Sequence, residues 1–138
     1  MPVNKKDIIP ERYEAKLKKS FQPTEVLMAD LCKRWHLKVL FSLEAAGYGA
    51  FRFKDIREKS GCTSDKMLDK AITELCDDGM VKKNFYPESP NRPDYILTER
   101  GRSLLVLLHQ LEKWVLEHQQ DIMDDRMESI EMREKYDK

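Results

Sequence analysis

The amino-acid sequence predicts a mainly α-helical α+β fold in which a β-hairpin lies between the last two helices. Apolar residues recur at helical spacing between residues 24 and 78, β-prone residues dominate 81–97, and residues 102–138 contain neither proline nor glycine. The chain has 138 residues, of which 41% are hydrophobic. This is enough for one ordinary core, so we expect a single domain with additional arms.

Charge is distributed unevenly along a chain whose formal net charge is zero. Residues 1–22 contain six Lys or Arg against three Asp or Glu, a net charge of +3, whereas residues 119–138 contain seven acids against four bases, a net charge of −3. We therefore divide the chain into a basic N-terminal arm at 1–22, a domain at 23–118 and a charged C-terminal helical extension at 119–138.

Several classes of protein are disfavoured by composition. No run of about 18 apolar residues is present, so we expect no membrane partner. The first residues lack the apolar stretch of a signal peptide. Cys32, Cys62 and Cys76 are odd in number and scattered, unlike the cysteines of a disulfide framework. These features together predict a cytoplasmic protein.

Two helices are expected before Gly47. Thr24 is a suitable N-cap for a short amphipathic helix, TEVLMADLCKRW, with apolar residues at positions 27, 28 and 31. From Trp35 to Leu43 the next segment is largely apolar, which is typical of a central buried helix. The stretch AAGYG, with Gly47, is expected to end it.

A helix-turn-helix is expected between residues 51 and 79. FRFKDIREKSG predicts a short extended entry and one or two helical turns that end at Ser60-Gly61. Ser64 is then the N-cap of a helix at 64–78, whose apolar and charged residues lie on opposite faces and which ends at Gly79. Two helices joined by a tight turn, with the second facing solvent, form this motif.

A hairpin and a long helix complete the expected fold. MVKKNFY and DYIL are β-prone, and PESPNRP between them is typical of a loop, so residues 81–97 predict a wing appended to the helix-turn-helix. Thr98 is expected to cap the last helix. Its apolar residues keep helical spacing from Leu104 to Ile122, and helices longer than about 25 residues commonly pair with a partner.

Four stretches in this order resemble the HxlR family of prokaryotic winged helix-turn-helix transcriptional regulators, over roughly residues 22–114. They are CKRWHLKVLFSL, FRFKDI, TSDKMLDKAITELCDDGMV and YPESPNRPDYILTERGRSL, and the last is the most specific. The resemblance implies a homodimer that binds a palindromic DNA operator. This sequence departs from the family by having Gln22-Pro23 in place of a redox-active Cys-Pro, Cys32-Lys33 in place of Gly-Gly, and acidic Asp65 and Asp69 on the recognition helix.

Candidate DNA contacts follow from charge and position. A free helix N-terminus at Ser64 can bind phosphate, and Lys66 and Lys70 lie one turn apart on the outer face, where they can donate to guanine or to phosphate. The alternatives are a plain cap and a solvated helix face; for Asp65 and Asp69 the solvated face is the preferred interpretation. The full set of candidate contacts is Arg34, Arg52, Lys54, Ser64, Lys66, Lys70 and Arg92.

Two of these candidates have a specific physical rationale. Prolines 87, 90 and 93 restrict the loop, so that Arg92 is held out at low entropic cost and can enter a narrow A·T-rich minor groove. Arg52 and Lys54 flank Phe53, whose ring can anchor the backbone while the charges point to phosphate. The alternative for Arg92 is an ordinary exposed arginine.

The remaining candidates concern dimerisation and chemistry. Cys62 precedes the Ser64 cap closely enough for redox sensing, although an inert small residue is the preferred interpretation. Cys32 and His36 are spaced i,i+4, but two ligands do not make a metal site, and no catalytic constellation is present, so we expect no enzyme, cofactor or metal. The candidate dimer contacts are Leu27, Leu104, Leu108, Leu111, Trp114 and Val115.

The sequence thus favours a homodimeric DNA-binding transcriptional regulator that reads a palindromic operator with the helix at 64–78 and the wing at 81–97. The alternative is a winged-helix protein-interaction module that has lost sequence-specific DNA binding because of Asp65 and Asp69. The electrostatic character of the recognition face distinguishes the two. A thiol or ligand sensor with enzymatic activity has the least support.

Overall fold

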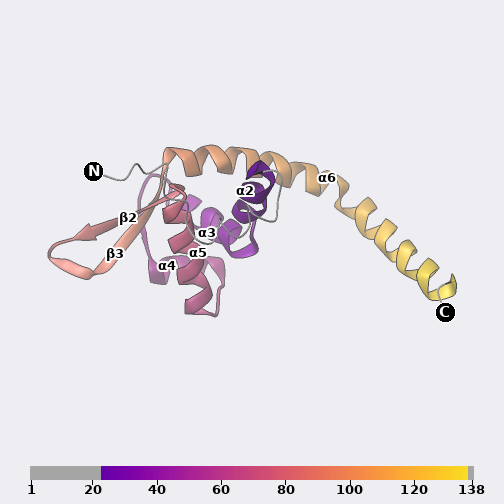
Figure 1. Ribbon diagram of the computed structural model, residues 1–138, viewed down its shortest axis with the longest axis horizontal. Helices are drawn as coiled ribbons and strands as arrows, with labels where there is room; N and C mark the ends of the chain where they lie inside the picture. The colour runs from indigo at the N-terminus through magenta and orange to yellow at the C-terminus, as the bar shows by residue number, and fades with distance from the viewer. Residues whose placement is uncertain (1–22, 137–138) are drawn as a thin grey trace.

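The computed structural model describes residues 23–136. The N-terminal arm, Gln22 included, and residues 137–138 lie outside the described residues. The elements in chain order are α2 (Pro23–Leu31), α3 (Arg34–Glu44), β1 (Phe51–Arg52), α4 (Phe53–Ser60), α5 (Asp65–Asp77), β2 (Val81–Tyr86), β3 (Ser89–Leu97) and α6 (Glu99–Tyr136). The expected mainly helical α+β fold with a β-hairpin before the last helix is confirmed (Figure 1).

A three-stranded antiparallel sheet forms the wing and ties it to the helix-turn-helix. The strand order is β1-β3-β2, so the returning strand of the hairpin is central. The short strand β1 pairs Phe51 with Tyr95 and Arg52 with Asp94. Beyond that pair the hairpin continues as two strands, and Figure 1 shows it projecting away from the helices.

The core lies among α3, α4 and α5, with the base of the hairpin and the first turns of α6 against it. Helix α3 is the central buried helix, as its apolar sequence predicts, because it contacts α4, α5, α6 and β3. The large apolar side chains with almost no exposed surface come from α3, α4 and α5: Val39, Leu40, Leu43, Ile56, Leu68, Ile72 and Leu75. This single core supports the sheet and α5 in one rigid unit.

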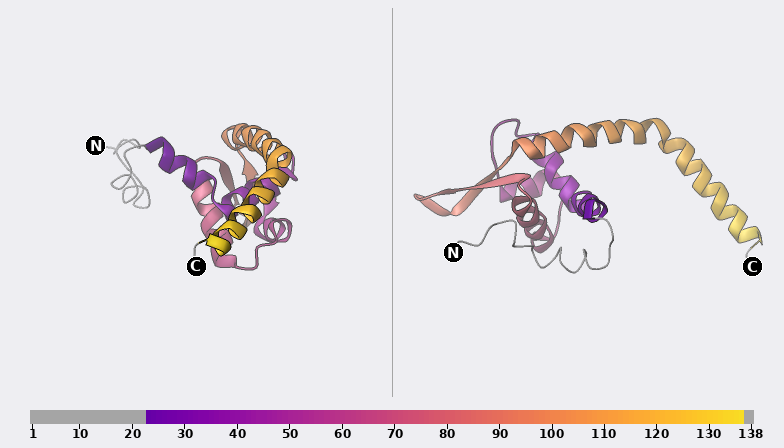
Figure 2. Two further views of the ribbon diagram at one scale, coloured as in Figure 1. Left: turned by 90° about the vertical axis from the view of Figure 1, so that its right-hand side faces the viewer. Right: turned by 45° about the horizontal axis from the view of Figure 1, so that its top comes forward.

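Helix α6 is much longer than the core that it covers. Its 38 residues extend about 57 Å at 1.5 Å per residue. Leu105 and Leu108 are buried, whereas the side chains from residue 109 to 136 are exposed, except for the half-buried Ile122. Figure 1 and Figure 2 show that α6 bends and that its C-terminal part projects away from the body.

Local signals at helix ends are mostly confirmed. Helix α4 ends at Ser60 and is followed by Gly61 with φ +70°, while Gly79 after α5 has φ +74°. Both are left-handed conformations that favour glycine. Thr98 precedes α6 and accepts a hydrogen bond from the Gly101 N–H at 3.1 Å, the geometry of a cap. The expectation that Thr24 is an N-cap is wrong: α2 already includes Pro23, and proline is tolerated in a first helical turn, where an N–H has no partner to lose.

The expectation of a proline-stiffened loop at 87–93 is also wrong. Strand β2 ends at Tyr86 and β3 begins at Ser89, so the turn is formed by Pro87 and Glu88, and Pro90 and Pro93 lie within β3. Both prolines fall at an irregularity in the pairing of β3 with β2, between the Tyr86–Ser89 pair and the Asn84–Asp94 pair, and β1 begins its pairing only at Asp94. Proline is tolerated in a strand whose N–H faces an unpaired edge.

None of the helices among the described residues is both long and apolar enough to cross a membrane.

Candidate nucleic-acid interface

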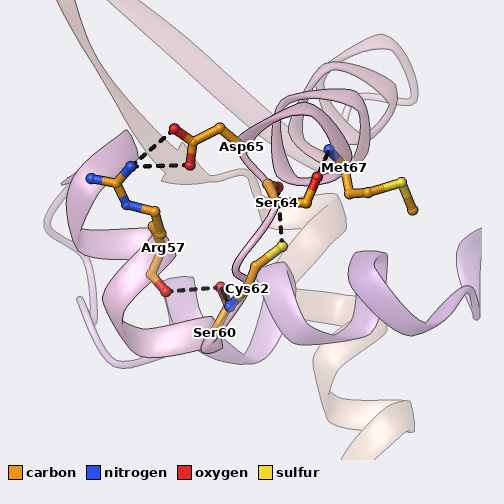
Figure 3. A network of polar contacts seen from close by, with 6 residues as sticks. All are labelled: Arg57, Ser60, Cys62, Ser64, Asp65 and Met67. Carbon is orange, nitrogen blue, oxygen red and sulfur yellow. Dashed lines mark hydrogen bonds and ion pairs between the residues drawn. The ribbon is translucent and has the colours of Figure 1, made fainter.

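The N-terminus of α5 is built by a short network of polar contacts. The Ser64 side chain accepts a hydrogen bond from the Met67 N–H at 3.2 Å, which confirms Ser64 as the N-cap (Figure 3). The Cys62 thiol donates to the Ser64 carbonyl at 3.3 Å, and the Cys62 N–H donates to the Ser60 hydroxyl at 3.3 Å. These bonds hold the turn between α4 and α5 in one conformation.

Asp65, the first residue of α5, is paired within the motif. The Arg57 Nη1 lies 3.0 Å from each of the two carboxylate oxygens of Asp65 (Figure 3). Both side chains are exposed, so the pair contributes little to stability. It does offset the negative charge of Asp65 at the start of α5, and such a pairing cannot be recognised from residues eight positions apart in sequence.

The outer face of α5 is polar, as the sequence predicts. Lys66, Asp69, Lys70 and Thr73 are exposed, whereas Leu68 on the opposite face is completely buried. Lys66 and Lys70 are one helical turn apart on this face. Ammonium groups spaced in this way can reach base edges or phosphates along a groove.

Arg52, Lys54 and Arg92, which are distant in sequence, line one surface depression of about 420 Å³. The pairing of Arg52 with Asp94 brings the start of α4 beside the hairpin and explains why they meet. Phe53 also lines the depression and packs partly against the core, which agrees with its expected role as an anchor. Arg92 therefore lies along β3 and not at a loop tip, beside two other cations.

A second depression, of about 210 Å³, lies between the N-terminus of α3 and the middle of α5. Arg34 and Lys70 both line it, so the structure brings these two candidate contacts together. The Arg34 guanidinium carbon is 5.2 Å from the ring centroid of Trp35, close enough for a cation–π interaction. The N-terminus of α3 has no side-chain cap, which leaves its N–H groups for other acceptors.

Sequence reasoning missed a buried polar pair beneath this second depression. His36 Nε2 lies 3.2 Å from a carboxylate oxygen of Glu74 on α5, and both residues are buried. Burial lowers the pKa of His36, and the Glu74 carboxylate only partly opposes that effect. His36 therefore has a structural role between α3 and α5. No cluster of three or more candidate metal ligands occurs among residues 23–136.

Cys62 occupies an environment typical of an unreactive thiol. Its side chain is 3% exposed, and its S–H donates a hydrogen bond to the Ser64 carbonyl. Cys32 is exposed and Cys76 is half-buried, and burial raises the pKa of the Cys76 thiol. A thiol that is covered and whose S–H is engaged in a hydrogen bond is a poor nucleophile.

The candidate dimer contacts fall into two groups. Leu27, Leu111, Trp114 and Val115 expose 46, 53, 51 and 42% of their surfaces. Leu104 is partly buried, and Leu108, at 7% exposure, belongs to the core of its own subunit. The uncovered apolar surface of α6 thus includes Leu107, beside the buried Leu108, and continues along the helix through Leu111, Trp114 and Val115.

The residues around Thr98, which we call the Thr98 junction, join three elements. The Thr98 hydroxyl lies 2.6 Å from the Gly79 carbonyl and 3.1 Å from the Met80 carbonyl, and its O–H donates a hydrogen bond to this pair of acceptors. Arg100 donates from Nη1 to the Asp78 carbonyl at 3.0 Å. The end of α5, the base of the wing and the start of α6 are therefore connected without a flexible linker.

Known proteins resemble this chain in both sequence and fold. The HxlR-like helix-turn-helix family matches residues 30–123. The HTH-type transcriptional regulator YvaP of Bacillus subtilis is 34% identical over 87 residues, which are 63% of this chain and 78% of YvaP. The solved structure of the reduced form of the transcriptional regulator YodB from B. subtilis has 31% identity and a TM-score of 0.59, and the match covers 70% of this chain and 92% of YodB.

A further solved structure, the redox regulator HypR in its reduced form, has 25% identity and a TM-score of 0.62 over 75% of this chain and 99% of HypR. The family match covers well over half of the present chain and includes α3, the helix-turn-helix, the wing and the first two thirds of α6. The chain therefore belongs to the HxlR-like helix-turn-helix family of transcriptional regulators.

Proposed function

We propose that this regulator acts as a homodimer that binds a palindromic DNA operator, with α5 in the major groove of each half-site and the wing against the neighbouring backbone and minor groove. The observation that carries the proposal is the convergence of Arg52, Lys54 and Arg92 in one basic depression beside the wing. Three cations on a rigid concave surface suit a DNA backbone, which is a dense row of phosphates. The exposed lysines of α5 then reach the base edges.

Each candidate contact has a distinct part in this proposal. Arg52 and Lys54 bind phosphates, while the capped N-terminus of α5 at Ser64 directs its positive dipole end to the backbone. Lys66 reads a base in the major groove. Arg34 and Lys70 line the second depression together and bind phosphate at the uncapped start of α3.

The proposed dimer uses the exposed apolar face of α6. Leu111, Trp114 and Val115 are about half exposed on a helix that continues past its own body. Burying them between two subunits removes apolar surface from water, which stabilises the dimer by about 25 cal/mol for each Å² of apolar surface buried. Substituting Trp114→Glu should convert the dimer to a monomer in light scattering at micromolar concentration, whereas Lys113→Ala on the opposite face should not. A wild-type monomer would contradict the proposal directly.

The salt dependence of DNA binding tests the proposed contacts. Each phosphate contact steepens the slope of log affinity against log salt by about 0.9. Arg52→Ala should lower affinity and flatten this slope by about that amount per subunit. Lys66→Ala should lower affinity by about 1–3 kcal/mol on the preferred operator and much less on unrelated DNA. The matched control, Lys113→Ala, should change neither quantity.

The alternative function, a winged-helix module that binds protein and not DNA, gives a different result in the same titrations. Exposed Asp69 on α5 would then repel phosphate, and wild type would show no operator selected from a genomic library even at low salt. The pairing of Asp65 with Arg57 favours the DNA-binding function, because it offsets one of the two negative charges, Asp65 and Asp69, that α5 would present to phosphate.

A further inference from the structure

The C-terminal part of α6 has a second apolar stripe that is separate from the proposed dimer face. Leu116, Met123, Met127 and Ile130 expose 60, 56, 58 and 40% of their surfaces. Their spacings of seven, four and three residues place them on one face of a helix. Relative to Val115 and Leu111, this face is rotated by about a third of a turn. We call these four residues the methionine stripe.

One edge of the methionine stripe is acidic. Asp121, Asp124, Glu128 and Glu131 are exposed and follow one another at spacings of three, four and three residues. Residues 119–136 contain six acids against three bases, a net charge of −3. Figure 1 and Figure 2 show this part of the helix projecting beyond the body, so the remainder of the described subunit does not cover it.

The chain itself contains a segment of complementary chemistry. Residues 1–22 have a net charge of +3, and their sequence places Ile9, Tyr13, Leu17 and Phe21 at every fourth position. The family match spans residues 30–123, so this segment and the second half of the methionine stripe, Met127 and Ile130, fall outside it. Two segments that each carry apolar residues and that have opposite net charges are suited to bind each other.

We propose that residues 1–22 of one subunit dock on the methionine stripe and its acidic edge in the other subunit. The proposal rests on the proposed dimer, because pairing through α6 carries each C-terminal extension past its own body toward the partner. Methionine side chains adapt to irregular apolar surfaces. The 18 residues of α6 from 119 to 136 extend about 27 Å. A segment of 22 residues has enough chain to run along that length, since a fully extended chain reaches roughly 3.3 Å per residue.

A charge exchange in the full-length protein tests this docking. Reversing Lys16 and Lys19 to Glu, or reversing Asp124 and Glu128 to Lys, should each raise the dimer dissociation constant about tenfold at low salt, since two exposed ion pairs are lost twice in a symmetric dimer. Combining the four substitutions restores opposite charges and should return most of the affinity. A combined variant as weak as the two separate ones would overturn the proposal.

The other edge of the helix provides the matched control. Arg126 and Arg133 lie on the opposite side of the methionine stripe, and reversing them to Glu should not interact with the Lys16 and Lys19 substitutions. If Lys16→Glu and Lys19→Glu lower DNA affinity and leave the dimer unchanged, the arm binds DNA and the docking is wrong. Failure of the proposed dimer can be distinguished from failure of the docking, because the wild-type protein would then already be a monomer before any substitution.

Disulfide trapping shows which subunit the arm contacts. With Cys32 changed to Ser, subunits that contain Leu17→Cys are mixed with subunits that contain Met127→Cys and are oxidised mildly. The proposal predicts a cross-linked heterodimer. A single subunit with both substitutions that forms only an intramolecular link at low concentration would refute docking between subunits.

Discussion

Gly101 provides a quantitative test of how closely the start of α6 packs against Met80 and Leu97. A Cβ atom added at this buried glycine would lie 2.2 Å from the Met80 carbonyl oxygen and 3.3 Å from Leu97 Cδ2. Ordinary contacts are at least about 3.4 Å, so Gly101→Ala requires the start of α6 to move away from Met80 by about 1 Å. The obstacle is backbone, which cannot rotate out of the way.

The expected loss follows from two opposing terms. Overpacking against a rigid neighbour costs up to about 3 kcal/mol, and the better helix propensity of alanine returns about 1 kcal/mol. We therefore expect the free energy of unfolding to fall by about 2 kcal/mol and the melting temperature by about 10 °C for a domain of this size. Urea and thermal denaturation at one fixed protein concentration measure both quantities.

The control for Gly101 is a nearby position on the same helix. Ser103 is exposed and donates only to the Arg100 carbonyl, so Ser103→Ala should change the free energy of unfolding by less than about 0.5 kcal/mol. A Gly101→Ala variant as stable as wild type would refute the close packing of α6 on the Met80 carbonyl. A variant that unfolds less cooperatively would indicate that α6 had separated from the body.

Three further predictions concern the wing, the pH dependence and the thiol. Arg92→Ala should cost more DNA affinity on an A·T-rich flank than on a G·C-rich one, and equal losses in gel-shift titrations would make Arg92 a phosphate contact. The hydrogen bond from His109 to Glu44 raises the pKa of His109. The resulting stabilisation is fully present below about pH 6.5 and is lost as pH rises through the higher folded pKa. Glu44→Gln should remove most of this dependence of the unfolding free energy on pH and leave the smaller contribution of Glu112. Mild peroxide should leave DNA binding intact because Cys62 is buried, and a loss that a thiol reductant reverses, and that persists when the exposed Cys32 is changed to Ser, would show that a covered thiol is reactive.

Features set by neighbouring residues were predictable from the sequence. The cap at Ser64 and the left-handed glycines Gly61 and Gly79 depend on a few adjacent side chains, and all three are confirmed. The division of α5 into buried and exposed faces also follows from periodicity alone. The helix-turn-helix could therefore be recognised before its tertiary contacts were known.

Features set by distant partners were not predictable. Whether Pro90 and Pro93 lie in a loop or a strand depends on how far β1 extends beside β3, and nothing near the prolines in sequence records that length. The pairing of His36 with Glu74 likewise joins residues 38 positions apart. Leu108 has the helical spacing of the dimer candidates, but the extent of the body beneath α6 decides that it is core.

If the proposed dimer binds a palindromic operator, the Thr98 junction should limit the operators that it tolerates. The elements α5, the wing and α6 meet at hydrogen bonds between Thr98, Gly79, Met80 and Gly101. The proposed DNA-binding elements, α5 and the wing, should therefore rotate together with α6 as one rigid body. Adding one base pair between half-sites rotates them by about 34–36° around the duplex. A hinge inside the subunit cannot absorb that rotation, so the α6 pairing must slip or the DNA must twist. Spacing between half-sites should then be selected as strictly as the bases themselves.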